Sequence, residues 1–219
     1  MSLFPRNPRF LTRGASRLRD DRLFIVACDD TYAPKQYFNF FKLTRVQIHV
    51  VPTEHDGRCA AQHVRNRLLD FDHEEDDELW LLLDTDHYTG ENHRYSFLSA
   101  IREARQKGVN VALSKPGFEL WLLLHHLEES DVSNLEDARQ VDVKLREVLG
   151  EYNKRNLKKE HYPLGNVCDA YRRAERLDLT VRGGDIPENN TSRVYQLWKA
   201  IVSQALSSQL PPELRDLLP

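Results

Sequence analysis

Short apolar segments of strand type alternate along the first 130 residues with segments of helical periodicity. The strand-like segments are "LFIVAC" (23–28), "VQIHVV" (46–51), "ELWLLL" (78–83) and "VNVALS" (109–114). Apolar residues at helical spacing predict helices after Pro34 and over 57–71, 94–108 and 117–129. Strands that alternate with helices of this length form parallel βαβ units, so we expect an α/β fold with a parallel sheet of about four strands flanked by helices.

The pattern changes after residue 130 and becomes entirely helical. We expect a helix that begins near Ser133 or Asn134, further helices over 165–177 and 192–206, and a loop between these two at 181–190. The first 21 residues combine several arginines with Pro, Gly and Ser and bury little apolar area. The predicted organisation is therefore a basic arm (1–21), an α/β domain (22–130) and a helical extension packed on that domain (131–219).

Composition restricts the function without defining it. The chain has 219 residues with a formal net charge of −3, so a nucleic-acid partner is not predicted by net charge and requires a local basic patch. Three cysteines, far apart and odd in number, predict neither a disulfide framework nor a structural zinc site. The N-terminus has no secretory signal, and no apolar run is long enough to span a bilayer, so we expect a cytoplasmic protein without membrane contact.

The clearest candidate chemistry lies in "LWLLLDTD", where a buried strand ends at Asp84 and Asp86. Residues i and i+2 of an extended segment point the same way, so both carboxylates should face one point. Two carboxylates held together repel each other unless a cation intervenes, and Mg²⁺ is the cation that carboxylates and substrate phosphates commonly share. We therefore predict that Asp84 and Asp86 bind Mg²⁺, with Mn²⁺ as a substitute.

Two other strand ends carry acids to the same predicted sheet edge. Asp29 and Asp30 follow the first strand in "LFIVACDD", and Glu119 lies in the first turn of the helix that follows the fourth strand. A structural interpretation remains open for each, since Asp is a common turn former or helix cap and an acid is favoured at a helix N-terminus.

Four motifs of the chain resemble the RloB-like family of the Toprim group. They are "CDDTYAPKQYF", with Cys28, Tyr37 and Phe38 in matching places, "WLLLDTDH", the box "SKPGFELWLLLHH" and the C-terminal "NNTSRVYQLWKAI". The box is the most specific of these, and together they span about residues 20–205. The resemblance implies a Toprim-like fold and Mg²⁺-dependent phosphodiester chemistry on DNA or RNA. It also implies a role in bacterial anti-phage defence or abortive infection, beside a partner ATPase of the ABC or AAA type.

The resemblance also implies roles for individual residues. Asp84 and Asp86 become the metal ligands, Asp29 takes the position of the family's catalytic glutamate, and Glu119 completes or orients the metal shell. Lys115, at the opening of the Glu119 helix, is a candidate contact for the scissile phosphate. The basic stretch between Tyr152 and Tyr162 is a candidate nucleic-acid track, with a solvated basic helix face as the alternative; its cations are Lys154, Arg155, Lys158 and Lys159.

The chain departs from the family pattern after its first strand. Asp29 stands where the family has glutamate and Asp30 where it has glycine, so the acid/base is about one methylene shorter and the backbone less open to phosphate. One alternative is therefore a catalytically degraded Toprim-like subunit that binds or regulates a defence ATPase. A remote alternative is a phosphatase of the haloacid-dehalogenase type, with Asp84 as nucleophile, Lys115 as its lysine and Asp185 in its acidic motif.

Overall fold

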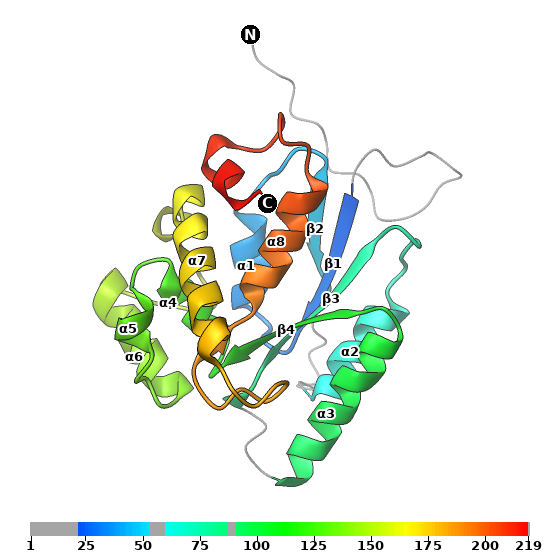
Figure 1. The fold of residues 1–219 in the computed structure, drawn as a ribbon, viewed down its shortest axis with the longest axis horizontal. Helices are drawn as coiled ribbons and strands as arrows, with labels where there is room; N and C mark the ends of the chain where they lie inside the picture. Colours follow the sequence, from blue (N-terminus) through cyan, green and yellow to red (C-terminus); the bar gives the residue numbers. More distant parts are fainter. Residues whose placement is uncertain (1–21, 53–59, 87–90, 219) are drawn as a thin grey trace.

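The computed structural model describes residues 22–52, 60–86 and 91–218, and the predicted basic arm and Cys59 lie outside these ranges. Four predicted strands are present: β1 (Arg22–Cys28), β2 (Val46–Val50), β3 (Glu78–Asp84) and β4 (Asn110–Lys115). They pair in parallel within a five-stranded sheet of order β2-β1-β3-β4-β5. The α/β prediction is thus confirmed, and the sheet is consistent with a Toprim-like fold (Figure 1).

The fifth strand is the part of the sheet that the periodicity did not predict. β5 is only two residues long (Thr191–Ser192) and pairs antiparallel with the end of β4, where the Ser114 and Ser192 hydroxyls lie 2.9 Å apart. A two-residue strand is too short to produce an alternating pattern, and its pairing depends on where the neighbouring helices bring it.

Helices cover both faces of the sheet (Figure 1). One face carries α2 (Ala61–Asp70) and α3 (Glu91–Gln106), which pack on the odd-numbered side chains of β1 and β3. The other face carries α1 (Ala33–Asn39), α4 (Phe118–Leu124), α6 (Ala138–Leu149), α7 (Leu164–Thr180) and α8 (Val194–Gln204). Because both faces are covered, β1, β3 and β4 are buried almost throughout, which explains their largely apolar sequence, whereas the centre of the edge strand β2 is only partly buried.

The helices after residue 130 share their core with the sheet. Trp198 of α8 and Leu145 of α6 are fully buried in the same cluster as Phe24 and Trp80 of the strands. Two shorter helical elements, α5 (Glu129–Val132) and the 3-10 turn Pro212–Leu217, complete this side of the molecule. Among the described residues, no helix is both long and apolar enough to cross a membrane.

Three local predictions of helices differ from the structure. The helix expected from Ser133 or Asn134 begins instead at Ala138, because Asp137 caps it by accepting the Gln140 N–H at 2.8 Å. The basic segment expected as a possible helix face is a loop that contains only the 3-10 turn Lys159–His161. The predicted helix over 117–129 is shorter than expected, since α4 ends at Leu124.

Candidate functional site: an acidic cleft at the sheet edge

The acids lie where the direction of the strand order reverses. The chain moves from β1 to β2 on one side and then returns to place β3 on the other side of β1. In open parallel sheets, ligands bind beyond the carboxyl ends of the strands at such a switch point. Cys28 pairs with Leu82 and Asp84 with Ser114, so β1, β3 and β4 end at nearly the same level.

A cleft of about 700 Å³ opens at this edge of the sheet. Five of its acids come from three separate segments: the loop after β1, the end of β3 and the first turn of α4. These five are Asp29, Asp30, Asp84, Asp86 and Glu119, and a sixth acid, Asp142 of α6, forms an ion pair with Arg146. The structure thus brings together all the acids that the sequence analysis selected.

Backbone contacts fix the end of β3. The Thr85 N–H donates to the Ser114 and Pro116 carbonyls at 3.0 and 3.2 Å, and the Asp86 N–H donates to the Pro116 carbonyl at 3.1 Å. The strand ends at Asp84 and the chain bends at Thr85, so the extended i, i+2 geometry does not continue to Asp86. Asp84 and Asp86 nevertheless both line the cleft.

Asp29 joins the ends of β1 and β3. One of its carboxylate oxygens accepts the Asp84 N–H at 2.9 Å and the other accepts the Asp30 N–H at 3.0 Å. Its side chain is only 8% exposed. Burial raises the pKa of Asp29 to about 8, even though these two backbone hydrogen bonds favour the ionised form.

Asp30 accepts hydrogen bonds from the backbone and forms an ion pair with one cation. Its Oδ1 accepts the N–H groups of Tyr32 and Ala33 at 2.6 and 3.1 Å, at the start of α1. Its Oδ2 lies 3.5 Å from the Lys154 ammonium. Asp30 therefore has a structural role in addition to its place in the cleft lining.

Asp84 and Glu119 converge beside Gly117. A methyl group on Gly117 would lie 3.1 Å from Asp84 Oδ2 and 3.3 Å from Glu119 Oε2, so the glycine leaves the room in which these two oxygens approach each other. Burial, together with the negative charges of Asp29 and Glu119, raises the pKa of Asp84 well above its usual value. Burial also raises the pKa of Glu119, whose Oε1 accepts a hydrogen bond from the Tyr152 hydroxyl at 3.2 Å.

The chemistry of this lining fits a hard divalent cation. The candidate metal ligands in it are carboxylate oxygens, and a bound cation would relieve the repulsion between them. Within the described residues, no three acid, histidine or cysteine side chains are arranged to hold a metal ion as they stand. Mg²⁺ commonly uses only one or two protein carboxylates and completes its shell with water and substrate phosphate, so a pair such as Asp84 and Glu119 meets its requirement.

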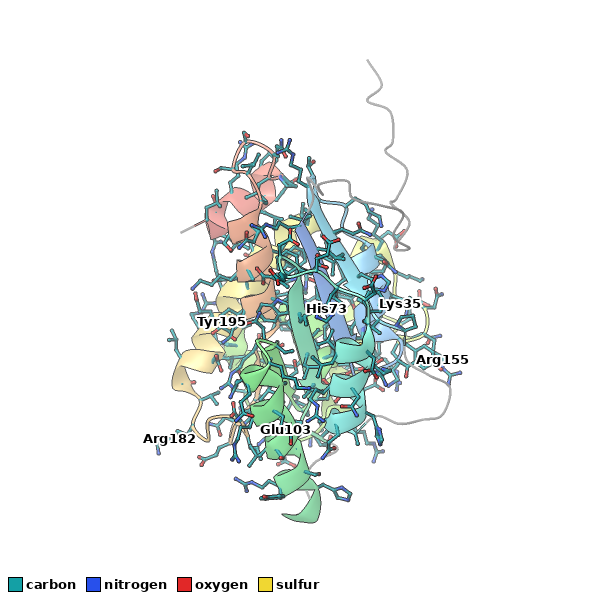
Figure 2. All side chains as sticks on the ribbon, turned by 90° about the vertical axis from the view of Figure 1, so that its right-hand side faces the viewer. Lys35, His73, Glu103, Arg155, Arg182 and Tyr195 are labelled. Carbon is teal, nitrogen blue, oxygen red and sulfur yellow. The ribbon has the colours of Figure 1, made fainter. Side chains whose placement is uncertain are left out.

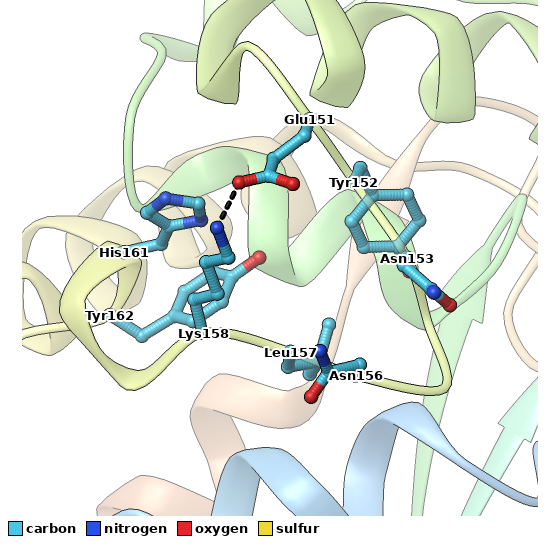
Figure 3. Close-up of a pocket in the computed structure, with 8 residues that line it drawn as sticks. All are labelled: Glu151, Tyr152, Asn153, Asn156, Leu157, Lys158, His161 and Tyr162. Atoms are coloured by element: carbon cyan, nitrogen blue, oxygen red, sulfur yellow. Dashed lines mark hydrogen bonds and ion pairs between the residues drawn. The ribbon is translucent and has the colours of Figure 1, made fainter.

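The basic residues predicted to bind nucleic acid divide into two groups. Lys154 and Arg155 line the cleft. Lys158 instead forms an ion pair with Glu151 inside a separate pocket of about 80 Å³, which Figure 3 shows beside Tyr162. Lys159 is exposed in the 3-10 turn and lines neither cavity.

Lys115 does not join the cleft. Its ammonium donates to the carbonyls of Pro187 and Glu188 at 2.9 and 2.7 Å, so it holds the loop before β5. Asp185, the third residue of the phosphatase alternative, forms an ion pair with Arg105. The lysine and acid that a dehalogenase-type phosphatase needs beside Asp84 are therefore engaged elsewhere.

The aromatic residues of the motifs that resemble the RloB-like family build the core beneath the site. Tyr37 of α1 is fully buried, and its hydroxyl lies 3.0 Å from the Nε2 of His125. Phe118 and Trp121 of α4 pack edge-on against the Tyr37 ring. Within the "FELW" box only Glu119 lines the cleft, so the rest of the box positions that carboxylate.

Among the lining residues that sequence reasoning missed, three carry an aromatic ring or a positive charge. Tyr32 follows Asp30 in the loop after β1, and Arg139 and Arg146 lie on α6. The two arginines are seven residues apart and therefore share one helix face, which was the available signal. Only the fold places that face beside α4 and hence beside the acids.

Comparison with known families agrees with the motifs. A family model described as "RloB-like protein" matches residues 24–201, a range that contains every acidic residue of the cleft. No curated protein and no solved structure matches the chain.

Proposed function

The chain belongs to the RloB-like protein family, and from this premise we propose that it is a metal-dependent nuclease that hydrolyses phosphodiester bonds in DNA or RNA. The proposal extends to the setting that the family resemblance implies, an anti-phage defence system in which the nuclease works with a partner ATPase.

One observation carries the proposal: carboxylates from three chain segments share a half-buried cleft at the switch point of the sheet. Uncompensated like charges are costly to bury, and perturbed acids in a cleft are typical of functional sites. Among the cations of the lining, Lys154 pairs with Asp30 at 3.5 Å.

The residues divide the work as follows. Asp84, Asp86 and Glu119 would hold Mg²⁺, which when bound supplies positive charge to the phosphoryl oxygens and the leaving oxygen. Tyr152 orients the Glu119 carboxylate through its 3.2 Å hydrogen bond. Asp29, with its pKa raised to about 8, can hold a proton near neutral pH and is the candidate general acid/base.

A specific observation favours the second candidate, a regulatory subunit without nuclease activity. Both carboxylate oxygens of Asp29 accept backbone N–H groups, so this shorter side chain acts as a clamp between β1 and β3. An acid/base must reach the proton that it transfers, and a clamped aspartate has less freedom to do so than a glutamate.

The direct test is cleavage by the purified protein. Labelled single-stranded DNA, plasmid and total tRNA are incubated with Mg²⁺ or Mn²⁺, with and without the co-encoded ATPase. We expect metal-dependent cleavage that Asp84→Asn lowers by roughly a hundredfold or more, because charge stabilisation is lost. Asp185→Asn, which changes an acid outside the cleft, is the matched control and should keep full activity. Absence of cleavage under all these conditions would overturn the nuclease proposal in favour of the regulatory subunit.

A further inference from the structure

Two arginines of the cleft have no carboxylate partner. Arg139 and Arg155 both line the cleft and are exposed, and neither forms an ion pair within the described part of the chain. Arg146 and Lys154, in contrast, pair with Asp142 and Asp30. The guanidinium groups of Arg139 and Arg155 are thus available to a ligand, and guanidinium geometry suits phosphate.

Tyr32 places an aromatic ring in the same lining. Its side chain is 38% exposed, while its backbone is fixed at both ends. The Asp30 carboxylate accepts its N–H at 2.6 Å, and its carbonyl accepts the Gln36 side-chain amide at 3.0 Å. The ring is therefore presented from a well-anchored position two residues from an acid of the site.

Arg155 lies over this ring. Its guanidinium carbon is 5.0 Å from the centroid of the Tyr32 ring, within the range of a cation–π contact. Figure 2 shows Arg155 at the edge of the molecule that also carries Lys35 of α1. An aromatic ring combined with cations along a groove is the arrangement with which proteins bind single strands, because bases stack on the ring and phosphates follow the charges.

The size and depth of the cleft restrict what can enter. Asp29 and Asp84 are only 8% and 9% exposed, so a phosphate must enter the cleft to come near them. The volume of about 700 Å³ is typical of a site for a small ligand. A short flexible segment of nucleic acid fits these limits, whereas in a double helix the bases are already stacked on each other and are not available to Tyr32.

We propose that the cleft binds a single-stranded segment of nucleic acid, with one base stacked on Tyr32 beside Arg155 and the backbone contacted by Arg139. This inference rests on the proposed nuclease function and deepens it by naming the substrate class. It assigns Tyr32 and Arg139 to substrate binding, a role that does not require them to take part in the chemistry.

Binding without turnover tests the inference separately from catalysis. The full chain is titrated with fluorescein-labelled single strands of DNA and RNA and with the matching duplexes, with Ca²⁺ in place of Mg²⁺, and anisotropy is recorded. We expect the single strands to bind more tightly than the duplexes. Tyr32→Ala should weaken strand binding by roughly tenfold, while Tyr32→Phe, which keeps the ring, should bind like the wild type.

Arginine variants provide the matched comparison. Arg139→Ala should weaken strand binding several-fold and reduce its salt dependence, since one phosphate contact is lost. Arg182→Ala removes an exposed arginine at the opposite edge of the molecule from Arg155 (Figure 2) and should leave binding unchanged. The unfolding transition of each variant checks that the fold is intact.

The outcomes separate the two proposals. Equal affinity for strand and duplex, or an unchanged affinity in Tyr32→Ala, would overturn the single-strand inference even if the protein cleaves nucleic acid. Strand binding that depends on Tyr32, without cleavage in Mg²⁺ or Mn²⁺, would support the inference and overturn the nuclease proposal. A preference between the DNA and RNA strands identifies which of the two the cleft accepts.

Discussion

Two acidic sites in this molecule differ in how their charge is compensated. Asp178 of α7 accepts hydrogen bonds from the Thr191 hydroxyl, the Arg193 guanidinium and the Tyr195 hydroxyl at 3.2, 2.9 and 2.9 Å. The acids of the cleft face each other instead, and burial together with the negative charge of Asp29 raises the pKa of Asp84.

This difference in compensation distinguishes an acid with a structural role from acids that can take part in chemistry. A carboxylate whose hydrogen bonds and charge are satisfied within the chain stabilises the fold, and Asp178 in this way fastens β5 and α8 to α7. A group of carboxylates left with mutual repulsion lowers the stability of the metal-free protein. Removing an acid should therefore have opposite effects on stability at the two sites.

The largest effect of a single substitution on stability is expected at Asp178. Asp178→Ala leaves the Arg193 guanidinium without its partner, and we expect a loss of about 3 kcal/mol in the free energy of unfolding, because the pair is mostly buried. Urea unfolding measures this change. Asp185→Ala removes an ion pair that is much more exposed and should cost less than about 1 kcal/mol. Equal losses in the two variants would show that burial does not set the strength of these two ion pairs.

A bound metal ion should offset the loss of stability that repulsion between the cleft carboxylates causes. At a Mg²⁺ concentration of about 100 times its Kd, we expect the free energy of unfolding to rise by about 2.7 kcal/mol. The rise should disappear in Asp84→Asn, whereas the metal-free form of this variant should be more stable than the metal-free wild type, since one buried charge is gone. Thermal unfolding with EDTA and with Mg²⁺ measures both. An identical Mg²⁺ response in Asp178→Ala is the control.

The dependence of stability on pH should also come from the cleft. Because folding raises the pKa of Asp29 to about 8, the folded state holds this proton more tightly than the unfolded state. The stability of the metal-free protein should therefore fall as pH rises from about 4 to about 8, by at most about 1.4 kcal/mol per unit from this group. Urea unfolding across this pH range in EDTA should show that the free energy of unfolding of Asp29→Asn changes less with pH than that of the wild type. An unchanged dependence on pH would contradict the assignment of this effect to Asp29.

A smaller effect on stability is expected from Asp29→Glu. The longer side chain displaces the hydrogen bonds to the Asp30 and Asp84 N–H groups, which should cost about 1 kcal/mol. It also brings the carboxylate further into the cleft, and we expect several-fold faster cleavage. Initial rates and urea unfolding measure the two consequences. An unchanged rate would indicate that this position no longer takes part in catalysis.

The apolar pattern predicted β1, β3 and β4 because both faces of the sheet are covered there and most residues of these strands must be apolar, whereas the edge strand β2 was predicted from its alternating sequence. β5 was not predicted, since two residues carry no periodicity. The start of α6 was misplaced because Ser133, Asn134 and Asp137 are all acceptable caps, and only the packing of the helix selects Asp137.

The sequence by itself determined which acids stand at the ends of strands, because the transition from an apolar run to "DTD" or "CDD" is visible in the letters. The tertiary structure alone decided which cations accompany them. Lys115 and Lys154 carry the same side chain, but the ammonium of Lys115 reaches the carbonyls of a loop and that of Lys154 reaches Asp30. Tyr32 and Arg139, more than 100 residues apart, line one cleft only because α4 and α6 pack against each other beside the end of β1. Local sequence encodes the direction of the chain and the burial of its segments, whereas the distance between residues far apart in sequence is set by how the helices pack.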